Sequence, residues 1–408
     1  MLLLAGLFLA SLALRPQLVG IGPLLSTIRH SLGVSHAVAG LLSTVIVLCM
    51  GLFAPVAFTI SRRIGPRWSI AAALALIAAF GLARALATPA AAVIALTLPV
   101  GIGVAIAGSL MPLVVTQSWA RRPVLGTAVY ATGISLGAAA SAALAVPLSE
   151  ALGGWRGALT AFSVFTAALV LVWVVLTRRY SYRFAAAEPL PRLPLRSRTG
   201  WLLVAIFAIV SISYYGVNAW LPSSFTERGW SHASAGALLT VLNAVTVPVA
   251  IALALRGDHY GSRRFWIAAG ATLQLAGLLG VIVAPAGGWA WAALIGAGIG
   301  LLFPSIMTMP LDIADRPSDV GALAALMLGA GYTLSALAPL LLGVLRDAAG
   351  SFTVGMWVIF ADTALLLCVA LLTSNERLRR RPGRTQPAER LLPASALTTA
   401  PRSAGPGC

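Results

Sequence analysis

The sequence predicts an all-α polytopic membrane protein whose twelve transmembrane helices form two six-helix, pseudo-symmetric halves. Of the 408 residues, 59% are hydrophobic and only 10% are charged, and the mean hydropathy is +0.93. This composition excludes an ordinary soluble protein. Apolar runs long enough to cross a hydrocarbon core of about 30 Å recur along nearly the whole chain. In addition, the second half of the chain repeats the first.

The apolar runs lie between charge clusters and Pro/Gly turns, which gives the spans in order. The strands of a membrane barrel would be shorter and would alternate between apolar and polar residues. The first run lacks a basic leader and is longer than a signal-peptide core, so we expect it to be retained as the first span. The first six spans are expected at 2–28, 36–60, 68–87, 91–116, 124–148 and 157–177. The second six are expected at 201–222, 234–255, 265–284, 289–311, 319–345 and 353–373.

An internal repeat divides the chain. The stretch "GVSHAVAGLLSTV" (33–45) aligns without gaps with "GWSHASAGALLTV" (229–241), and the same register places "SRRIGPRW" over "GDHYGSRR". The stretch between the two copies is rich in arginine and proline and cannot continue a helix. We therefore expect an N-terminal six-helix half, a basic cytoplasmic linker, a C-terminal six-helix half and a basic, disordered cytoplasmic tail. Their respective bounds are 1–177, 178–200, 201–373 and 374–408.

The charge distribution predicts the orientation of the chain. Its 28 basic residues are all arginine and its formal net charge is +17. Because most of them fall in the even-numbered loops and the tail, the positive-inside rule places both termini and the linker in the cytoplasm. Basic residues between apolar spans report orientation, so we expect no nucleic-acid partner. The arginines assigned to odd-numbered loops are Arg29, Arg84, Arg156, Arg228 and Arg346.

Arg15 lies inside the first span, in "LALRPQLVGIGPLL" (12–25). A charged side chain near mid-membrane costs about 2.5–3.5 kcal/mol unless it faces a cavity or a partner. Pro16 removes a backbone donor and loosens the helix around it. Three interpretations stay open for Arg15: it binds an anionic or strongly dipolar substrate, it forms a structural ion pair or caps carbonyls, or it lies less deep because the N-terminus is short.

Two six-helix halves joined by a basic loop resemble the major facilitator superfamily. The superfamily's loop after the second helix of each half carries an acid, a glycine and basic residues. "DHYGSRR" (258–264) has all of them, whereas the first half has an arginine where the acid belongs. The resemblance implies a gating role at the cytoplasmic face, where a carboxylate and arginines interact with helix ends. The candidate gating residues are Arg62, Arg63, Gly65, Asp258, Gly261, Arg263 and Arg264.

Three further segments narrow the resemblance. "LALRPQLVGIGPLLSTIR", "AGLLSTVIVLCMGLFAPVA" and "YYGVNAWLPSSFTERGWSHASAGALL" are similar to the cyanate porter branch, which includes cyanate and 2-nitroimidazole transporters. The resemblance covers nearly all of residues 1–373. It implies a secondary transporter that works by alternating access and carries a small anion or small polar solute, cyanate-like. The alternative is proton-coupled efflux of small nitroimidazole-type or drug-like compounds.

The superfamily's architecture implies which spans line the path, namely one, four, seven and ten, with two, five, eight and eleven beside them. Polar and aromatic residues in these spans are the candidate substrate-binding residues, although each of them suits packing between helices equally well. They are Arg15, Gln17, Tyr130, Tyr214, Asn218, Trp220, Asn243, Ser305 and Tyr332. Asp362 is the one acid well inside a span and is a candidate for proton coupling. Its place on the peripheral twelfth span favours a structural role instead.

Other classes of protein are disfavoured. Asp312, Asp315 and Asp319 could suggest a metal-dependent membrane enzyme, but they form no second cluster and suit the capping of the eleventh helix. The histidines lack ligand spacing, so we expect no metal, no cofactor and no catalytic residues. A non-transporting sensor would usually carry an added soluble domain. We therefore expect a transporter, monomeric and multi-pass in the cell (plasma) membrane, with a small-molecule substrate, the lipid bilayer and protons as candidate partners.

Overall fold

The computed structural model describes residues 2–118, 123–178, 193–256, 263–314 and 317–372. These residues form helices and turns, with no strand among them. Ten helices are long and apolar enough to cross a membrane, and two shorter apolar helices, Leu2–Leu12 and His36–Leu52, lie where the first and second spans are expected. The all-α fold is thereby confirmed.

The helices of each half follow the expected order. The N-terminal half contains α1 (Leu2–Leu12), the 3₁₀ helix η1 (Gly22–Leu24), α2 (Leu25–Leu32), α3 (His36–Leu52), α4 (Ala54–Leu86), α5 (Ala90–Ser118), α6 (Pro123–Ala151) and α7 (Trp155–Leu176). The C-terminal half contains α8 (Arg198–Thr226), α9 (His232–Arg256), α10 (Arg263–Val283), η2 (Pro285–Gly287), α11 (Gly288–Met307), α12 (Met309–Ile313), α13 (Pro317–Ser335), α14 (Leu337–Ala349) and α15 (Thr353–Leu372).

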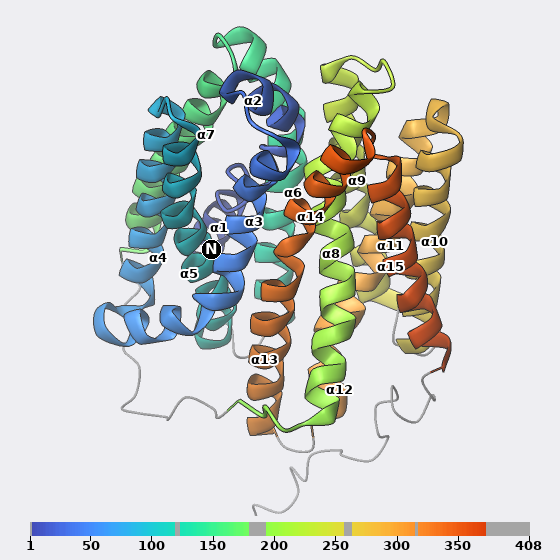
Figure 1. The fold of residues 1–408 in the computed structure, drawn as a ribbon. Coiled ribbons are helices and arrows are strands. Elements are labelled where there is room, and N and C mark those ends of the chain that lie inside the picture. The colour runs from blue at the N-terminus through green and yellow to red at the C-terminus, as the bar shows by residue number, and fades with distance from the viewer. Residues whose placement is uncertain (1, 119–122, 179–192, 257–262, 315–316, 373–408) are drawn as a thin grey trace, which may run out of the picture.

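The two halves stand side by side, and four regions make most of the contact between them. Helix α3 packs against α13 and α14, and α6 packs against α9 (Figure 1). These helices are the second and fifth spans of each half. The second span of each half packs against the fifth span of the other half. The pseudo-symmetry expected from the sequence therefore appears in the packing.

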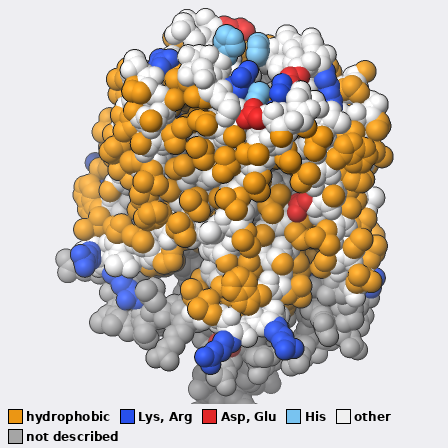
Figure 2. Space-filling model, viewed as in Figure 1, with side chains coloured by type: hydrophobic (Ala, Val, Ile, Leu, Met, Phe, Trp, Pro, Cys, Tyr) orange, Lys and Arg blue, Asp and Glu red, His pale blue; other side chains and the backbone are white. Residues whose placement is uncertain are grey.

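The surface and the core match a bilayer environment. In Figure 2 apolar side chains cover a broad belt, and most charged side chains lie at the two ends of the bundle. We call the end where α7 finishes and α8 begins the linker end, and the other end the distal end. One buried apolar cluster contains residues of both halves, whereas a second cluster, with Leu203, Phe207 and Leu366, belongs to the C-terminal half alone. Because α8 starts and α15 finishes at the linker end, the second cluster lies toward that end, and the α8 residues of the shared cluster, which begin at Tyr214, lie toward the distal end.

The first span is not the continuous helix that the sequence predicts. Helix α1 ends at Leu12, and helical structure resumes only at Gly22. In between, the amides of Leu18 and Val19 both donate to the Arg15 carbonyl, at 3.0 and 2.8 Å. Pro16 has no N–H to offer and its ring obstructs a regular helix. The break therefore exposes backbone polar groups at membrane depth, which is tolerated only where protein surrounds them.

The second and third spans are joined by a kink where the sequence predicts a loop. Helix α4 runs from the end of the second span to the end of the third, and only Gly65 departs from helical geometry, with φ 81° and ψ 156°. A side chain at this φ would collide with the backbone, so the kink favours glycine at this position. Pro66 follows and starts the next helical stretch without needing an amide donor.

Replacing Gly65 by alanine should destabilise the protein. A non-glycine residue in such a region costs about 1–3 kcal/mol, so we expect a lower midpoint of thermal unfolding for Gly65→Ala in detergent, followed by tryptophan fluorescence. Gly321→Ala is the matched control, because a Cβ at Gly321 meets no atom within 4 Å. Equal unfolding midpoints for the two variants would contradict the proposed strain.

Candidate functional site

The candidate site centres on Arg15, in the interrupted part of the first span. Its guanidinium interacts electrostatically with Tyr214 and Tyr215 of α8 and with Tyr332 of α13. One of its nitrogens, Nη1, is buried and has no hydrogen-bond partner. A cation from the N-terminal half therefore faces aromatic hydroxyl groups of the C-terminal half, with hydrogen-bonding capacity left over.

The three tyrosines form one continuous aromatic group. The ring centroids of Tyr214 and Tyr215 are 5.1 Å apart, and those of Tyr215 and Tyr332 are 6.1 Å apart. The Tyr215 hydroxyl also lies 3.9 Å from the Met50 sulfur of α3. Edge-to-face rings of this kind have restricted positions. They can therefore fix how a small ligand approaches the guanidinium.

A buried polar network extends from Tyr214 into α9. The Tyr214 hydroxyl donates to the Asn243 side-chain oxygen at 3.1 Å, and the Asn243 amide donates to the Asn218 oxygen at 3.1 Å. The Asn218 amide in turn donates to the Tyr214 carbonyl at 2.9 Å. Since buried polar groups are costly unless they are paired, this closed network fixes α8 against α9 beside Arg15.

Four other sequence-predicted site residues lie elsewhere. Gln17 is fully buried and bound by Arg84 of α4 and Ser163 of α7. Trp220 donates to the Pro339 carbonyl at 2.7 Å, near the distal end. Ser305 is buried in α11, and Tyr130 lies half-buried on α6. None of these four is among the groups that interact with Arg15.

Two of the candidate gating residues, Arg263 and Arg264, contact their own half. Arg263 forms an ion pair with Asp312 at 2.8 Å, so Asp312 is held by α10. Arg264 donates to the Leu371 carbonyl at the end of α15. Their role in gating stays a prediction. Arg62 and Arg63 are exposed beside Gly65, and Asp258, Gly261 and Asp315 lie outside the described residues.

Asp362 stands apart from the candidate site. It lies in α15, which packs against α8, α10 and α14 at the periphery of its half. Its Oδ2 atom is buried and has no hydrogen-bond partner. The coupling role stays a prediction.

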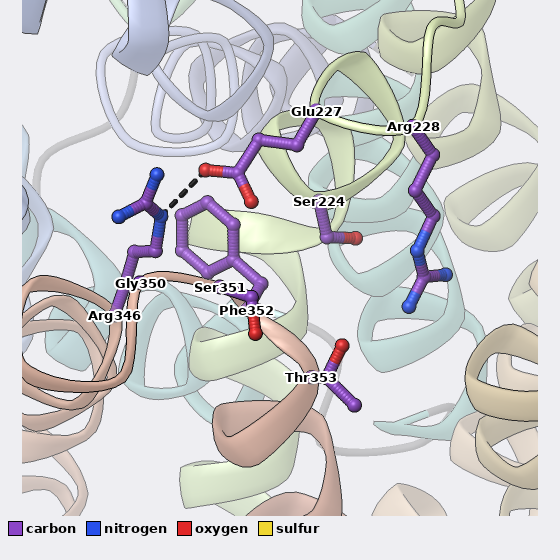
Figure 3. Close-up of a pocket in the computed structure, with 8 residues that line it drawn as sticks. All are labelled: Ser224, Glu227, Arg228, Arg346, Gly350, Ser351, Phe352 and Thr353. Carbon is purple, nitrogen blue, oxygen red and sulfur yellow. Dashed lines mark hydrogen bonds and ion pairs between the residues drawn. The ribbon is translucent and has the colours of Figure 1, made fainter.

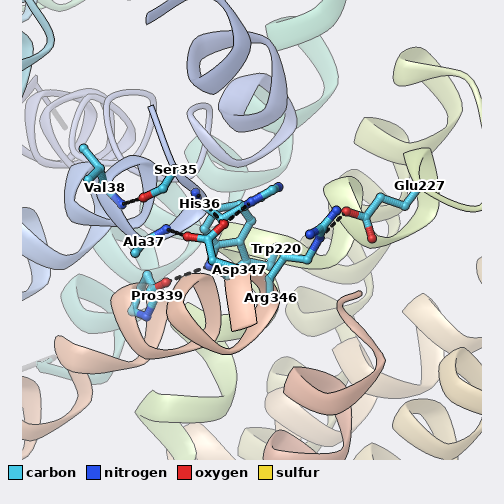
Figure 4. A network of polar contacts seen from close by, with 9 residues as sticks. All are labelled: Ser35, His36, Ala37, Val38, Trp220, Glu227, Pro339, Arg346 and Asp347. Carbon is cyan, nitrogen blue, oxygen red and sulfur yellow. Dashed lines mark hydrogen bonds and ion pairs between the residues drawn. The ribbon is translucent and has the colours of Figure 1, made fainter. Parts of the chain in front are cut away.

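A polar contact between the halves, which the sequence does not reveal, lies at the distal end (Figure 4). The Asp347 carboxylate, at the end of α14, accepts hydrogen bonds from the backbone amides of His36 and Ala37 at 3.1 and 2.9 Å, and it lies 2.6 Å from the His36 ring. The carboxylate therefore caps the N-terminus of α3. His36 also contacts the rings of Trp220 and Phe352. The sequence shows His36 at a helix start, but its partner is distant in the chain.

A polar cavity of about 350 Å³ opens beside this contact, within the C-terminal half (Figure 3). Arg346 is paired there with Glu227 at 2.6 Å, and Arg228 donates to the Val281 carbonyl. Burial lowers the pKa of Arg228, while the Glu227 charge opposes that effect. Because its cations already have partners, the cavity is a less suitable anion site than Arg15. It is lined by Ser224, Glu227, Arg228, Arg346, Gly350, Ser351, Phe352 and Thr353.

Twelve spans in two similar halves, with a cation between them, define a membrane transporter of the two-domain type. The family model described as Major Facilitator Superfamily matches residues 3–336 and 226–403. The chain belongs to this superfamily, whose members are transporters and not enzymes. No group of three or more potential metal ligands occurs among the described residues.

Curated relatives agree with the resemblance to the cyanate porter branch. The 2-nitroimidazole transporter of Escherichia coli (strain K12) is 28% identical over 377 residues, which is 92% of this chain and 96% of the relative. The cyanate transport protein CynX of the same strain is 29% identical, over 85% of this chain and 90% of the relative. An uncharacterized transporter of Bacillus subtilis (strain 168), YycB, is 25% identical over 88% of this chain and 90% of the relative.

Solved structures share the fold. A bacterial homologue of the human lysosomal transporter Spinster, in an inward-facing and occupied conformation, has a TM-score of 0.71 at 16% identity and covers 90% of this chain and 94% of its own. A mutant of the nucleoside transporter NupG has a TM-score of 0.73 at 11% identity, with 90% and 99% covered. At such identities the likeness shows the fold alone.

Removing the Tyr214 hydroxyl should destabilise the C-terminal half. In Tyr214→Phe the buried Asn243 oxygen loses its donor, which costs about 1–3 kcal/mol, so we expect a lower thermal unfolding midpoint. Tyr130→Phe is the matched control, since the Tyr130 hydroxyl makes no hydrogen bond to the described residues. If both variants unfolded at the temperature of the unmodified protein, the network would contribute no stability.

Proposed function

We propose that this protein transports a small anion or a small polar solute, cyanate-like, and that Arg15 binds it. The observation that carries the proposal is the Arg15 guanidinium, which interacts with three tyrosines across the interface between the halves and whose Nη1 atom is buried without a hydrogen-bond partner. A fixed guanidinium in a low-dielectric site attracts an anion strongly and offers it directed donors. The cyanate and 2-nitroimidazole transporters among the relatives support this substrate class.

The second candidate is proton-coupled efflux of nitroimidazole-type or drug-like compounds. It is favoured by the aromatic group of Tyr214, Tyr215 and Tyr332, which offers ring faces and edges to a flat heteroaromatic compound. A nitro group could accept the same Arg15 donors that a small anion would use. Asp362 is our candidate for proton coupling in either case.

Transport by alternating access requires each end of the bundle to open in turn. We propose that the His36–Asp347 contact holds the distal end closed, since it joins α3 of one half to α14 of the other. The distal end can open only when this contact separates. The arginines around Gly65 and Gly261 are our candidates for the corresponding control at the linker end.

We further propose that the protein is a monomer in the plasma membrane, with both termini and the linker at the cytoplasmic face. The arginine-rich even-numbered loops support this orientation. On the same grounds the halves are assigned to residues 1–177 and 201–373, with a linker at 178–200 and a tail at 374–408. The distal end is then the outer end of the protein.

The anion site is tested by flux of radiolabelled cyanate into proteoliposomes, with and without an imposed pH gradient. We expect Arg15→Ala to lower uptake at limiting cyanate by about ten- to hundredfold, because a charge-assisted hydrogen bond is lost. Arg15→Lys should retain part of the uptake. Arg196→Ala, which removes an exposed arginine, is the control.

Two results of this experiment would count against the proposal. Unchanged uptake by Arg15→Ala would make Arg15 structural. An absence of cyanate flux in the unmodified protein would move the substrate search to 2-nitroimidazole. A response to the pH gradient that Asp362→Asn abolishes would support proton coupling through Asp362.

The distal closure is tested by Asp347→Asn, which removes the charge that caps α3. With spin labels at the exposed positions Ser31 and Ala348, we expect the distance distribution to shift to longer values, because the cross-half contact is weakened. Glu227→Gln is the matched control, since it removes a carboxylate at the same end whose partner, Arg346, lies in the same half. Identical distributions for all three proteins would show that Asp347 does not hold the end closed.

A further inference from the structure

Arg84, which the sequence suggests lies in an odd-numbered loop, is buried in the N-terminal half. Its exposed fraction is 0%, so the loop assignment is wrong. Its Nη2 atom donates to the Gln17 carbonyl at 3.0 Å and to the Gln17 side-chain oxygen at 2.6 Å, and Nη1 donates to the Thr97 hydroxyl at 3.2 Å. All three acceptors are neutral. Burying a cation whose only hydrogen-bond acceptors are neutral is unfavourable in free energy. The partners of Arg84 should therefore explain why an arginine is buried here.

The principal partner, Gln17, belongs to the interrupted part of the first span. Because residues 13–21 lie between helices, no regular helical ladder supplies a donor for the Gln17 carbonyl. An unpaired carbonyl at membrane depth costs several kcal/mol. Arg84 supplies that donor and binds the side chain of the same residue, which makes a two-point attachment.

Gln17 is also held by a second helix, α7. Its amide nitrogen donates to the Ser163 hydroxyl of α7 at 2.9 Å. On α4, a Cβ at Gly81 would lie 2.8 Å from that same nitrogen, so the helix approaches Gln17 as closely as glycine permits. Helices α4 and α7 thus fix Gln17, and α5 holds Arg84 through Thr97.

We propose that Arg84 is a positioning residue: through Gln17 it fixes the non-helical stretch 13–21 and thereby sets where Arg15 stands between the halves. Gln17 is separated from Arg15 only by Pro16, whose ring restricts rotation of the backbone between them. A displacement of Gln17 therefore moves the Arg15 backbone. This inference rests on the proposed anion site at Arg15. Arg84 itself contacts no substrate in this proposal.

The test compares the cyanate KM and Vmax of Arg84→Lys with those of the unmodified protein, per amount of folded transporter. A lysine keeps the charge but cannot bind both Gln17 oxygens and Thr97 with fixed geometry. We expect the KM to rise by about five- to tenfold, with a smaller change in Vmax. Arg156→Lys is the matched control, because Arg156 also binds a backbone carbonyl of this half, that of Ala87 at 3.0 Å, and this acceptor lies outside the first span.

A second variant and a second measurement keep the test decisive. Gln17→Met removes the side-chain acceptor of Arg84 and the donor to Ser163 at similar volume but keeps the Gln17 carbonyl as an acceptor, so its KM should rise less than that of Arg84→Lys, and it serves if Arg84→Lys does not fold. Hydrogen–deuterium exchange of a peptide covering residues 13–21 should be faster in either variant than in Arg156→Lys. This readout does not depend on the substrate.

The outcomes separate this inference from the proposed function. Lower Vmax or stability with an unchanged KM would make Arg84 a purely structural support and would overturn the inference. Faster exchange with an unchanged KM would overturn the link from Arg84 to Arg15. If the unmodified protein carries no cyanate, the proposed substrate fails; the KM comparison then uses 2-nitroimidazole, while the exchange measurement still decides whether Arg84 holds residues 13–21.

Discussion

The central constraint on this structure is that the first span contains unpaired backbone groups and a permanent charge. These groups must find hydrogen-bond partners inside the protein, because the hydrocarbon of the bilayer offers none. Pro16 interrupts the helix, and the carbonyls and amides that the break releases need partners. Within the N-terminal half, Arg84 and Gln17 meet part of that need. Arg15 remains with a donor to spare and faces the tyrosines of the other half. The same break thus explains both a structural network and a site with capacity for a ligand.

Duplication supplied the architecture, and later divergence gave the halves different tasks. His36 and His232 occupy equivalent positions at the starts of α3 and α9. His36 is buried against Asp347, whereas His232 is exposed. The buried Arg84 likewise has no buried arginine as its counterpart among the described residues of the second half, where neutral side chains of α8 and α9 form a polar network instead. Around Arg15, a charged side chain of one half therefore faces neutral, aromatic side chains of the other, an asymmetry that a symmetric pair would lack.

The packing also shows how a transporter can be held in one state without being locked there. Along α8, the apolar core shared by the two halves lies toward the distal end, and the C-terminal half has a separate cluster toward the linker end. The cap that Asp347 provides for α3 consists of a few hydrogen bonds at the rim of that core. Contacts of this size can be broken and re-formed during a cycle, whereas the separate cluster lies wholly within the C-terminal half and does not cross the interface between the halves.

The sequence by itself determined the number and order of spans, the repeat and the superfamily, and it made Arg15 a candidate site residue, because hydropathy, charge and local motifs are properties of neighbouring residues. It also indicated Tyr214, Asn218 and Tyr332, through their helix numbers. It could not show that Gln17 is bound within one half, that Trp220 lies in the distal contact, or that Arg84 is buried. Each of these depends on a partner from a distant part of the chain, and only tertiary packing decides which partner that is. An arginine near a predicted span end has the same local sequence whether it meets water or a buried carbonyl.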